Sequence, residues 1–156
     1  MEIYTDGSRT PQRSGWGVLI KDGRFYHCLS GEKKGATNND MELTAFFEAL
    51  NYCKGKRFPV SIHTDSMYVL NTFFKMKDGT KTKDSAQYEP GSRGWVYGWD
   101  LSVDRPNLDL IKKIKEIIPT VKISSITWVK GHKGLEGNEI ADQLANGVAP
   151  CKLRMD

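Results

Sequence analysis

The chain has 156 residues, of which 38% are apolar and 27% charged, with a formal net charge of +4. This length and composition favour one soluble globular domain with a substantial core, and no apolar run approaches a membrane span. The mildly basic charge permits a polyanionic partner without requiring one. The first residues show no secretory signal, and three widely spaced cysteines favour reduced thiols in a cytoplasmic setting.

The N-terminal part of the chain predicts an antiparallel meander of three strands. Residues 2–6 alternate in polarity and end at an Asp-Gly turn. Two further strands are predicted over 15–21 and 24–30, and Asp22-Gly23 between them is a strong hairpin pattern.

A helix and a further strand follow the meander. The helix is predicted from about residue 39 to residue 53, with Asn38 or Asn39 as its N-cap. The strand covers 59–65, and because it follows a helix, a parallel pairing with the first strand is expected. Ser66 is placed to cap a short helix after this strand.

The second half of the chain begins with an irregular stretch. Residues 75–106 are rich in Lys, Gly, Asp and aromatics and show no clear period. A helix over about 107–118, a strand over 121–129 and a last helix over about 136–148 come next. The order of elements predicts an α/β fold, a mixed five-stranded sheet flanked by helices.

Four carboxylates are placed unusually along these elements. "IYTDGS" and "IHTDSM" each end a strand in Thr-Asp, so Asp6 and Asp65 are expected to meet at one edge of the sheet. Glu42 shares the apolar stripe of its own helix, where an unpaired charge is costly. Asp142 lies beside alanines in the last helix.

Each acid also has a simpler interpretation. Asp6 would be a turn residue, Asp65 an N-cap or turn acid, and Asp142 a solvated side chain. A capping box is the best simple explanation for Glu42. Taken together the simple explanations lose ground, because converging carboxylates repel one another unless they are protonated or bound to cations. Two hard divalent ions about 4 Å apart form a known clamp for phosphodiester displacement.

Four motifs carry a family resemblance. "TDGS", "TNNDMEL", "TDSMYV" and "WVKGHKGLEGNEIADQLA" resemble ribonuclease H of type I in order and spacing, from residue 2 to about residue 149. The resemblance implies a ribonuclease H domain over 1–150 and a short C-terminal tail over 151–156. It further implies a monomeric, cytoplasmic endonuclease with no membrane association. This enzyme would hydrolyse the RNA strand of RNA–DNA hybrids with two Mg²⁺ ions, Mn²⁺ being a substitute, and leave 5′-phosphate and 3′-hydroxyl ends.

The resemblance also assigns roles to residues of the site. Asp6, Glu42, Asp65 and Asp142 match the family's metal-binding acids. Asp6 would bridge both ions, Glu42 and Asp65 would hold one of them, and Asp142 would complete the other. His132 matches a mobile histidine that assists catalysis by helping product leave, although it would otherwise pass for a solvated loop residue.

The residues expected to bind substrate fall in two groups. Thr37, Asn38 and Asn39 match the stretch that contacts the substrate backbone and minor groove. The segment 75–105 corresponds to the family's basic handle, and its acids dilute the charge, so a solvated loop is the alternative. Its candidate contacts are Lys81, Lys83, Arg93 and Trp95, the last with packing as an equally good interpretation.

The sequence departs from the family pattern at two places. The glycine-rich turn after the first strand is shorter here, and Arg9 and Arg13 would supply backbone contacts in its place. Met67 stands where many relatives carry a polar residue that contacts the groove, which puts one minor-groove contact in doubt.

Two other functions share this fold. A non-catalytic hybrid-binding module would need a broken carboxylate, and none is found. A DNA-cutting integrase or transposase core is disfavoured by the Thr-Asn-Asn and Gly-His-Lys-Gly elements. The sequence leaves open whether the chain acts alone or as a domain of a larger polymerase.

Overall fold

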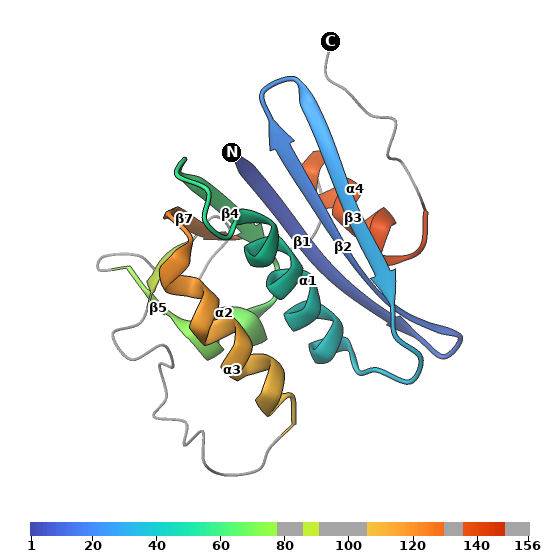
Figure 1. The fold of residues 1–156 in the computed structure, drawn as a ribbon. Coiled ribbons are helices and arrows are strands. Elements are labelled where there is room, and N and C mark those ends of the chain that lie inside the picture. Colours follow the sequence, from blue (N-terminus) through green and yellow to red (C-terminus); the bar gives the residue numbers. More distant parts are fainter. Residues whose placement is uncertain (78–85, 91–105, 130–135, 149–156) are drawn as a thin grey trace.

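A computed structural model of the chain describes residues 1–77, 86–90, 106–129 and 136–148 (Figure 1). The helices and strands found in these ranges follow one another in the predicted order, except that two unpredicted strands, β5 and β6, lie between α2 and α3. They are β1 (Glu2–Thr10), β2 (Arg13–Asp22), β3 (Phe25–Glu32), α1 (Asn38–Cys53), β4 (Val60–Thr64), α2 (Met67–Phe73), β5 (Phe74–Met76), β6 (Gln87–Pro90), α3 (Leu108–Ile117), the 3-10 turn η1 (Ile118–Thr120), β7 (Ile123–Trp128) and α4 (Glu136–Ala145).

The strands within the described ranges form one mixed sheet in the order β3-β2-β1-β4-β7-β6-β5. The meander β1-β2-β3 is antiparallel, while β4 lies parallel to β1 on one side and to β7 on the other. All five predicted strands are present, and the α/β class is confirmed. The sheet has seven strands in the described ranges rather than five, so the predicted strand number is wrong.

The two additional strands, β5 and β6, form a short hairpin at and after residue 74, where the sequence shows no clear period. β5 pairs with β6, and β6 pairs with β7 through Gln87 opposite Thr127 and Tyr88 opposite Ile126. The backbone N–H of Trp128 donates to Ala86 O at 2.8 Å and extends this pairing. With only three and four residues, these strands are too short to show a reliable period, and pairing with β7 stabilises them.

Helices cover both faces of the sheet, with α1 and α3 on one face and α4 on the other (Figure 1). Neighbouring residues of a strand point to opposite faces, and the core divides accordingly. Ile3 and Val18 belong to the larger cluster with α1, α2 and α3, whereas Tyr4 and Leu19 belong to a smaller cluster with α4. Within the described ranges, no helix combines the length and apolar character needed to cross a membrane.

Two element boundaries differ from the prediction near the acids. β1 does not end at Asp6 but continues to Thr10, because its ladder with β2 runs on to the pair Thr10 and Arg13. The N-cap of α1 is Thr37 rather than either asparagine, since its side-chain oxygen accepts from Asp40 N at 3.1 Å.

Candidate active site

The parallel pairing of β1 with β4 ends immediately before two of the acids. The last paired residues are Thr5 and Thr64, and Asp6 and Asp65 follow them. Beyond this point β1 continues along β2, whereas β4 ends and the chain turns toward α2. β1 and β4 therefore separate, and the place where their pairing ends is called the gap here. Asp6 is therefore a residue within a strand and not a turn residue, and both acids lie at the gap as predicted.

Glu42 reaches this gap from α1 because the helix lies very close to β1. A Cβ atom on Gly7 would collide with the backbone of Met41 and Glu42, so only glycine allows this approach. Thr37 is the N-cap of α1, and a capping box would use the third residue after the cap, which is Asp40. Glu42 lies two residues further on, which excludes the capping box as the explanation for its position.

The structure brings three of the four predicted acids into direct proximity. One carboxylate oxygen from each of Asp6, Glu42 and Asp65 lies within 4.8 Å of the other two. The residues Asp6 and Glu42 are only 4% and 7% exposed, although they are acids. Such a cluster cannot hold three negative charges without compensation.

The pKa values of the two buried acids reflect this crowding. Burial raises the pKa of Asp6 to about 10, and the charges of Glu42 and Asp65 and a side-chain hydrogen bond with Asp142 add to the rise. Burial, followed by the charge of Asp65, also raises the pKa of Glu42 well above its ordinary value. The site is therefore built to be neutralised, either by protons or by cations.

Asp142 comes from α4, on the opposite face of the sheet from Glu42. The helix lies directly on β2, because a Cβ atom on Gly17 would be 2.6 Å from both Ala141 O and Leu144 Cβ. This close docking places Asp142 near Asp6, where it contributes to the raised pKa of the Asp6 carboxyl. Acids from both helical layers thus meet at the gap between β1 and β4.

Trp128 on β7 also contributes to the site, although the sequence alone did not single it out. Its indole Nε1 donates to the backbone oxygen of Asp65 at 3.1 Å. On the other side of Asp65, Ser66 caps α2 through Val69 N, as predicted. The backbone of Asp65 is therefore held from both sides. The role of Trp128 follows from its pairing opposite Thr64, the residue before Asp65, and this pairing is visible only in the folded sheet.

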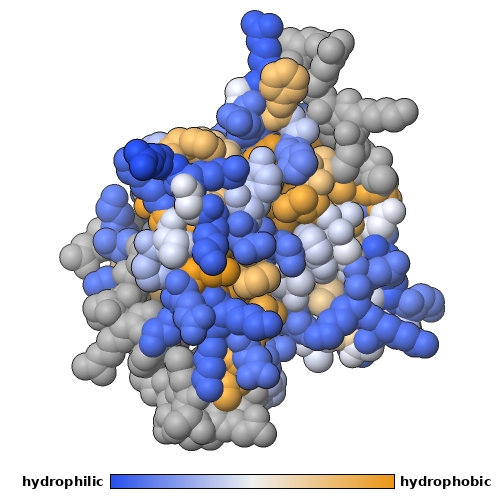
Figure 2. All heavy atoms as spheres, viewed as in Figure 1, coloured by the Kyte–Doolittle hydropathy of each residue, from blue (hydrophilic) through white to orange (hydrophobic). Residues whose placement is uncertain are grey.

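The predicted substrate-binding residues of α1 are accessible. Thr37, Asn38 and Asn39 are exposed at the first turn of the helix that carries Glu42. Next to this turn, hydrophilic side chains gather over the tip of the β1–β2 hairpin, at the lower right of the view in Figure 2.

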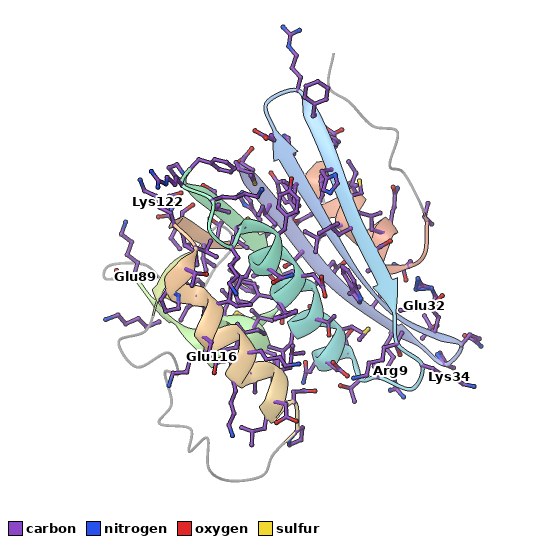
Figure 3. All side chains as sticks on the ribbon, in the orientation of Figure 1. Arg9, Glu32, Lys34, Glu89, Glu116 and Lys122 are labelled. Atoms are coloured by element: carbon purple, nitrogen blue, oxygen red, sulfur yellow. The ribbon has the colours of Figure 1, made fainter. Side chains whose placement is uncertain are left out.

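A surface hollow of about 480 Å³ lies at this tip. Arg9, Arg13, Glu32 and Lys34 are among the residues that line it. Figure 3 shows Arg9, Glu32 and Lys34 lying together at this end of the sheet. Arg13 is engaged within the fold, since its Nε lies 3.4 Å from Glu32 Oε2 and its Nη1 donates to Ala145 O at 3.0 Å. The hollow is thus a basic surface beside the exposed first turn of α1.

Other predicted site residues lie outside the described ranges. These are His132, Lys81, Lys83, Arg93 and Trp95. Of the departures from the family pattern, Arg9 and Arg13 border the hollow, and Met67 is the first residue of α2.

The donor set of the cluster fits a hard divalent cation. Every candidate ligand atom in it is a carboxylate oxygen, and oxygen ligands suit Mg²⁺ and Mn²⁺ rather than soft metals. Cations placed among these oxygens would offset the repulsion that raises the pKa values of Asp6 and Glu42.

Comparisons with known proteins identify the family. The family model for RNase H matches residues 1–149. A ribonuclease H from Albidiferax ferrireducens is 36% identical over 159 aligned positions, which cover 99% of this chain and 97% of that protein. A ribonuclease HI from Neisseria meningitidis serogroup A is 37% identical, covering 92% of this chain and 91% of that protein.

A solved structure agrees with these relatives. The crystal structure of LC11-RNase H1 in complex with an RNA/DNA hybrid superposes with a TM-score of 0.60 at 25% identity, covering 94% of each chain. The fold and the acidic site are those of a nuclease of the α/β class. The chain belongs to the ribonuclease H family, which confirms the expected family and the expected kind of enzyme.

Proposed function

We propose that this chain is an endonuclease that hydrolyses the RNA strand of RNA–DNA hybrids and leaves 5′-phosphate and 3′-hydroxyl ends. The observation that carries the proposal is the cluster of three carboxylates in a chain of the ribonuclease H family. The hybrid bound in the LC11-RNase H1 structure supports the choice of substrate. The chain is proposed to act as a monomer in the cytoplasm.

The proposed cofactors are two Mg²⁺ ions, for which Mn²⁺ would substitute. Asp6, Glu42 and Asp65 would hold them, and Asp142, beside Asp6, would complete the set. When bound, the ions would activate a water for attack on the phosphodiester and stabilise the leaving oxygen.

The chain itself supplies the arrangement of the acids. The backbone N–H of Gly7 donates to Asp6 Oδ1 at 2.9 Å, and Trp128 holds the backbone of Asp65. The close contact of α1 with β1 keeps Glu42 at the gap. Because these groups are already in place before substrate arrives, little reorganisation is needed during the reaction.

The substrate would lie across the exposed first turn of α1. We propose that Asn38 and Asn39 contact the minor groove, with the ribose 2′-hydroxyl as the feature that separates RNA from DNA. Thr37 would contact the backbone. His132 would assist product release, while Lys81, Lys83, Arg93 and Trp95 would form the more distant contacts; the described part of the structure does not include these five residues.

The test compares cleavage of matched RNA–DNA, RNA–RNA and DNA–DNA duplexes in the presence of Mg²⁺ and after its removal by a chelator. We expect cleavage of the hybrid alone, in its RNA strand, and only with the divalent cation. Efficient cleavage of the all-DNA duplex would favour a DNA-cutting integrase-like enzyme. Binding of the hybrid with no cleavage would favour the non-catalytic module.

A matched pair of variants on α1 tests the acidic cluster. Glu42→Gln removes one ligand and should lower the turnover at saturating Mg²⁺ by about 10²-fold or more, since each tenfold corresponds to about 1.4 kcal/mol and a metal contributes several. Glu48→Gln makes the same change on the same helix, outside the cluster, and should cleave at the wild-type rate. Equal turnover of the two variants would contradict the two-ion assignment.

A further inference from the structure

The end of α4 carries a polar network that the proposed reaction does not account for. Asn146 Nδ2 donates to the backbone oxygen of Asp142 at 2.9 Å and to its carboxylate Oδ1 at 3.3 Å. Ser8 Oγ on β1 donates to Asn146 Oδ1 at 2.7 Å. The network therefore joins Ser8 and Asn146, which are 138 positions apart in sequence. At its other end it reaches Asp142, one of the four acids.

The chemistry of the partners fixes the orientation of the Asn146 amide. A carbonyl oxygen and a carboxylate oxygen only accept hydrogen bonds, so the NH₂ group must face Asp142. The amide oxygen then faces Ser8, whose hydroxyl donates to it. Reversing the amide would place its oxygen against the two acceptor oxygens of Asp142, so Asp142 sets the orientation, and the Ser8 hydroxyl holds the amide in it.

The position of Ser8 explains why it can reach this network. It lies two residues after Asp6 on β1, so both side chains point to the same face of the sheet, which is the face that α4 covers. Ser8 and Asp6 therefore approach the same helix at neighbouring points. Asp142 lies between them in the network, with Asn146 on one side and Asp6 on the other.

The helix end itself is fixed by its own backbone. Gly147 has a φ of +84°, Gly147 N donates to Leu144 O at 3.1 Å, and Val148 N donates to Gln143 O at 2.9 Å. These bonds form a Schellman motif with Asn146 as the residue before the left-handed glycine. Arg13 adds a cationic donor to Ala145 O. Because the backbone is closed without it, the side chain of Asn146 is not required to end the helix.

We propose that Asn146, held in place by Ser8, is a positioning residue that aims the carboxylate of Asp142 at Asp6. The proposal rests on the proposed function, in which Asp142 completes the set of cation ligands. The amide N–H occupies Oδ1 of Asp142 and thereby limits rotation of the carboxylate. Groups that orient a metal ligand in this way commonly change metal affinity about 10-fold to 100-fold when they are removed.

The experiment measures cation binding separately from catalysis, using the full chain without substrate. Mn²⁺ is titrated by calorimetry into wild type and Asn146→Ala, and the Mg²⁺ dependence of hybrid cleavage is measured in parallel. We expect Asn146→Ala to bind Mn²⁺ about 10-fold more weakly and to need about 10-fold more Mg²⁺ for half-maximal turnover. The KM for hybrid at saturating Mg²⁺ should be unchanged, because Asp142 is not proposed to contact substrate.

Three further variants separate positioning from stability. Ser8→Ala should weaken Mn²⁺ binding in the same direction by a smaller factor, and Ser8→Thr, which keeps the hydroxyl, should restore it. The double variant Ser8→Ala/Asn146→Ala should be no weaker than Asn146→Ala, because both act through one carboxylate. Gln143→Ala removes an exposed side chain from the same turn of α4 and should bind Mn²⁺ like wild type.

The outcomes distinguish this proposal from the proposed function. If wild type neither binds Mn²⁺ nor cleaves the hybrid, the proposed function fails and this inference falls with it. If wild type does both and Asn146→Ala binds Mn²⁺ equally well, only the positioning role is overturned. A lower melting temperature of Asn146→Ala with unchanged Mn²⁺ affinity would likewise overturn it, since that result describes a merely structural helix end.

Discussion

Single buried charges are costly, and Asp6 and Glu42 are both buried in the same site. The folded chain binds a proton at Asp6 more tightly than the unfolded chain does, because the pKa is raised from 3.8 to about 10. A group whose pKa is raised on folding contributes stability that is present below its unfolded pKa and is lost as pH rises through its folded pKa. Without cations, Asp6 therefore lowers the stability of the fold increasingly between about pH 4 and pH 10.

Asp6→Asn should remove this penalty while it abolishes cleavage. In chelator at pH 8 we expect the variant to gain about 0.5–2 kcal/mol in unfolding free energy, or roughly 1–8 °C in Tm for a chain of this size. The gain should shrink at pH 5, because the proton that Asp6 takes up on folding costs less free energy at lower pH. Denaturant unfolding at the two pH values measures the difference.

The control for this prediction is Asp22→Asn, the same change in an exposed turn. An Asn-Gly turn suits a hairpin as well as Asp-Gly does, so the pH dependence of wild type should persist in it. A gain in Asp6→Asn that is identical at both pH values would show that the charge of Asp6 is not the cause.

At the scale of the elements, the site depends on close contacts between helices and strands. Gly7 admits α1 to β1 and Gly17 admits α4 to β2, on opposite faces of the sheet. In both cases the neighbouring atoms are largely backbone, which cannot rotate away as a flexible side chain can. A methyl group at either position would therefore displace a whole helix together with the acid that it carries.

Gly17→Ala should lower the unfolding free energy by roughly 1–3 kcal/mol, the usual cost of overpacking a well-packed contact. The displacement of α4 should also move Asp142 and so raise the Mg²⁺ concentration needed for half-maximal cleavage. Ser30→Ala is the matched control, because Ser30 lies opposite Gly17 on β3 but is exposed, outside the cover of α4. This control should change the stability by less than about 0.5 kcal/mol. A Gly17→Ala variant as stable as the control would mean that α4 can shift without cost.

Elements with strong local patterns were predictable from the sequence, and elements that depend on distant partners were not. The Asp22-Gly23 hairpin is present with Gly23 at a φ of +61°, as its residue types require. The hairpin of β5 and β6 was missed because its pairing with β7 joins segments far apart in the chain.

The same distinction applies to the candidate site. Asp6 and Asp65 could be brought together from two similar strand ends, and Glu42 from its place on an apolar stripe. The contact between Ser8 and Asn146 left no trace in the sequence, because both are common polar residues and their proximity arises only when α4 docks on the sheet. The cap of α1 was misplaced by one or two residues because Thr37, Asn38 and Asn39 are all good capping residues.

At the scale of the whole molecule, the net charge of +4 is small for a protein that is proposed to bind a polyanion. Where the positive charges lie should therefore matter more than how many there are. Arg9 and Lys34 border the basic hollow beside the first turn of α1. Arg24 and Lys54 are also exposed, but Arg24 lies at the turn between β2 and β3, and Lys54 follows the last residue of α1.

Two double variants with the same net charge test this point. Arg9→Ala/Lys34→Ala should raise the KM for hybrid and reduce its dependence on salt, by about 0.9 in the logarithmic slope for each phosphate that the variant no longer binds. Arg24→Ala/Lys54→Ala removes as much charge and should leave the slope unchanged. The measurement is KM for hybrid over a range of salt concentrations. Equal effects of the two variants would show that only the overall field attracts the substrate.

The hairpin of β5 and β6 has a consequence for how copies of this chain behave together in solution. Without it, the sheet would end on this side in β7, a strand of six residues with an open row of backbone groups. With it, the outermost strand on this side in the described part of the chain is β5, which has three residues and an exposed lysine at its centre, Lys75. A very short edge that carries a lysine is a poor template for intermolecular strand pairing, so the hairpin protects this side of the sheet against aggregation.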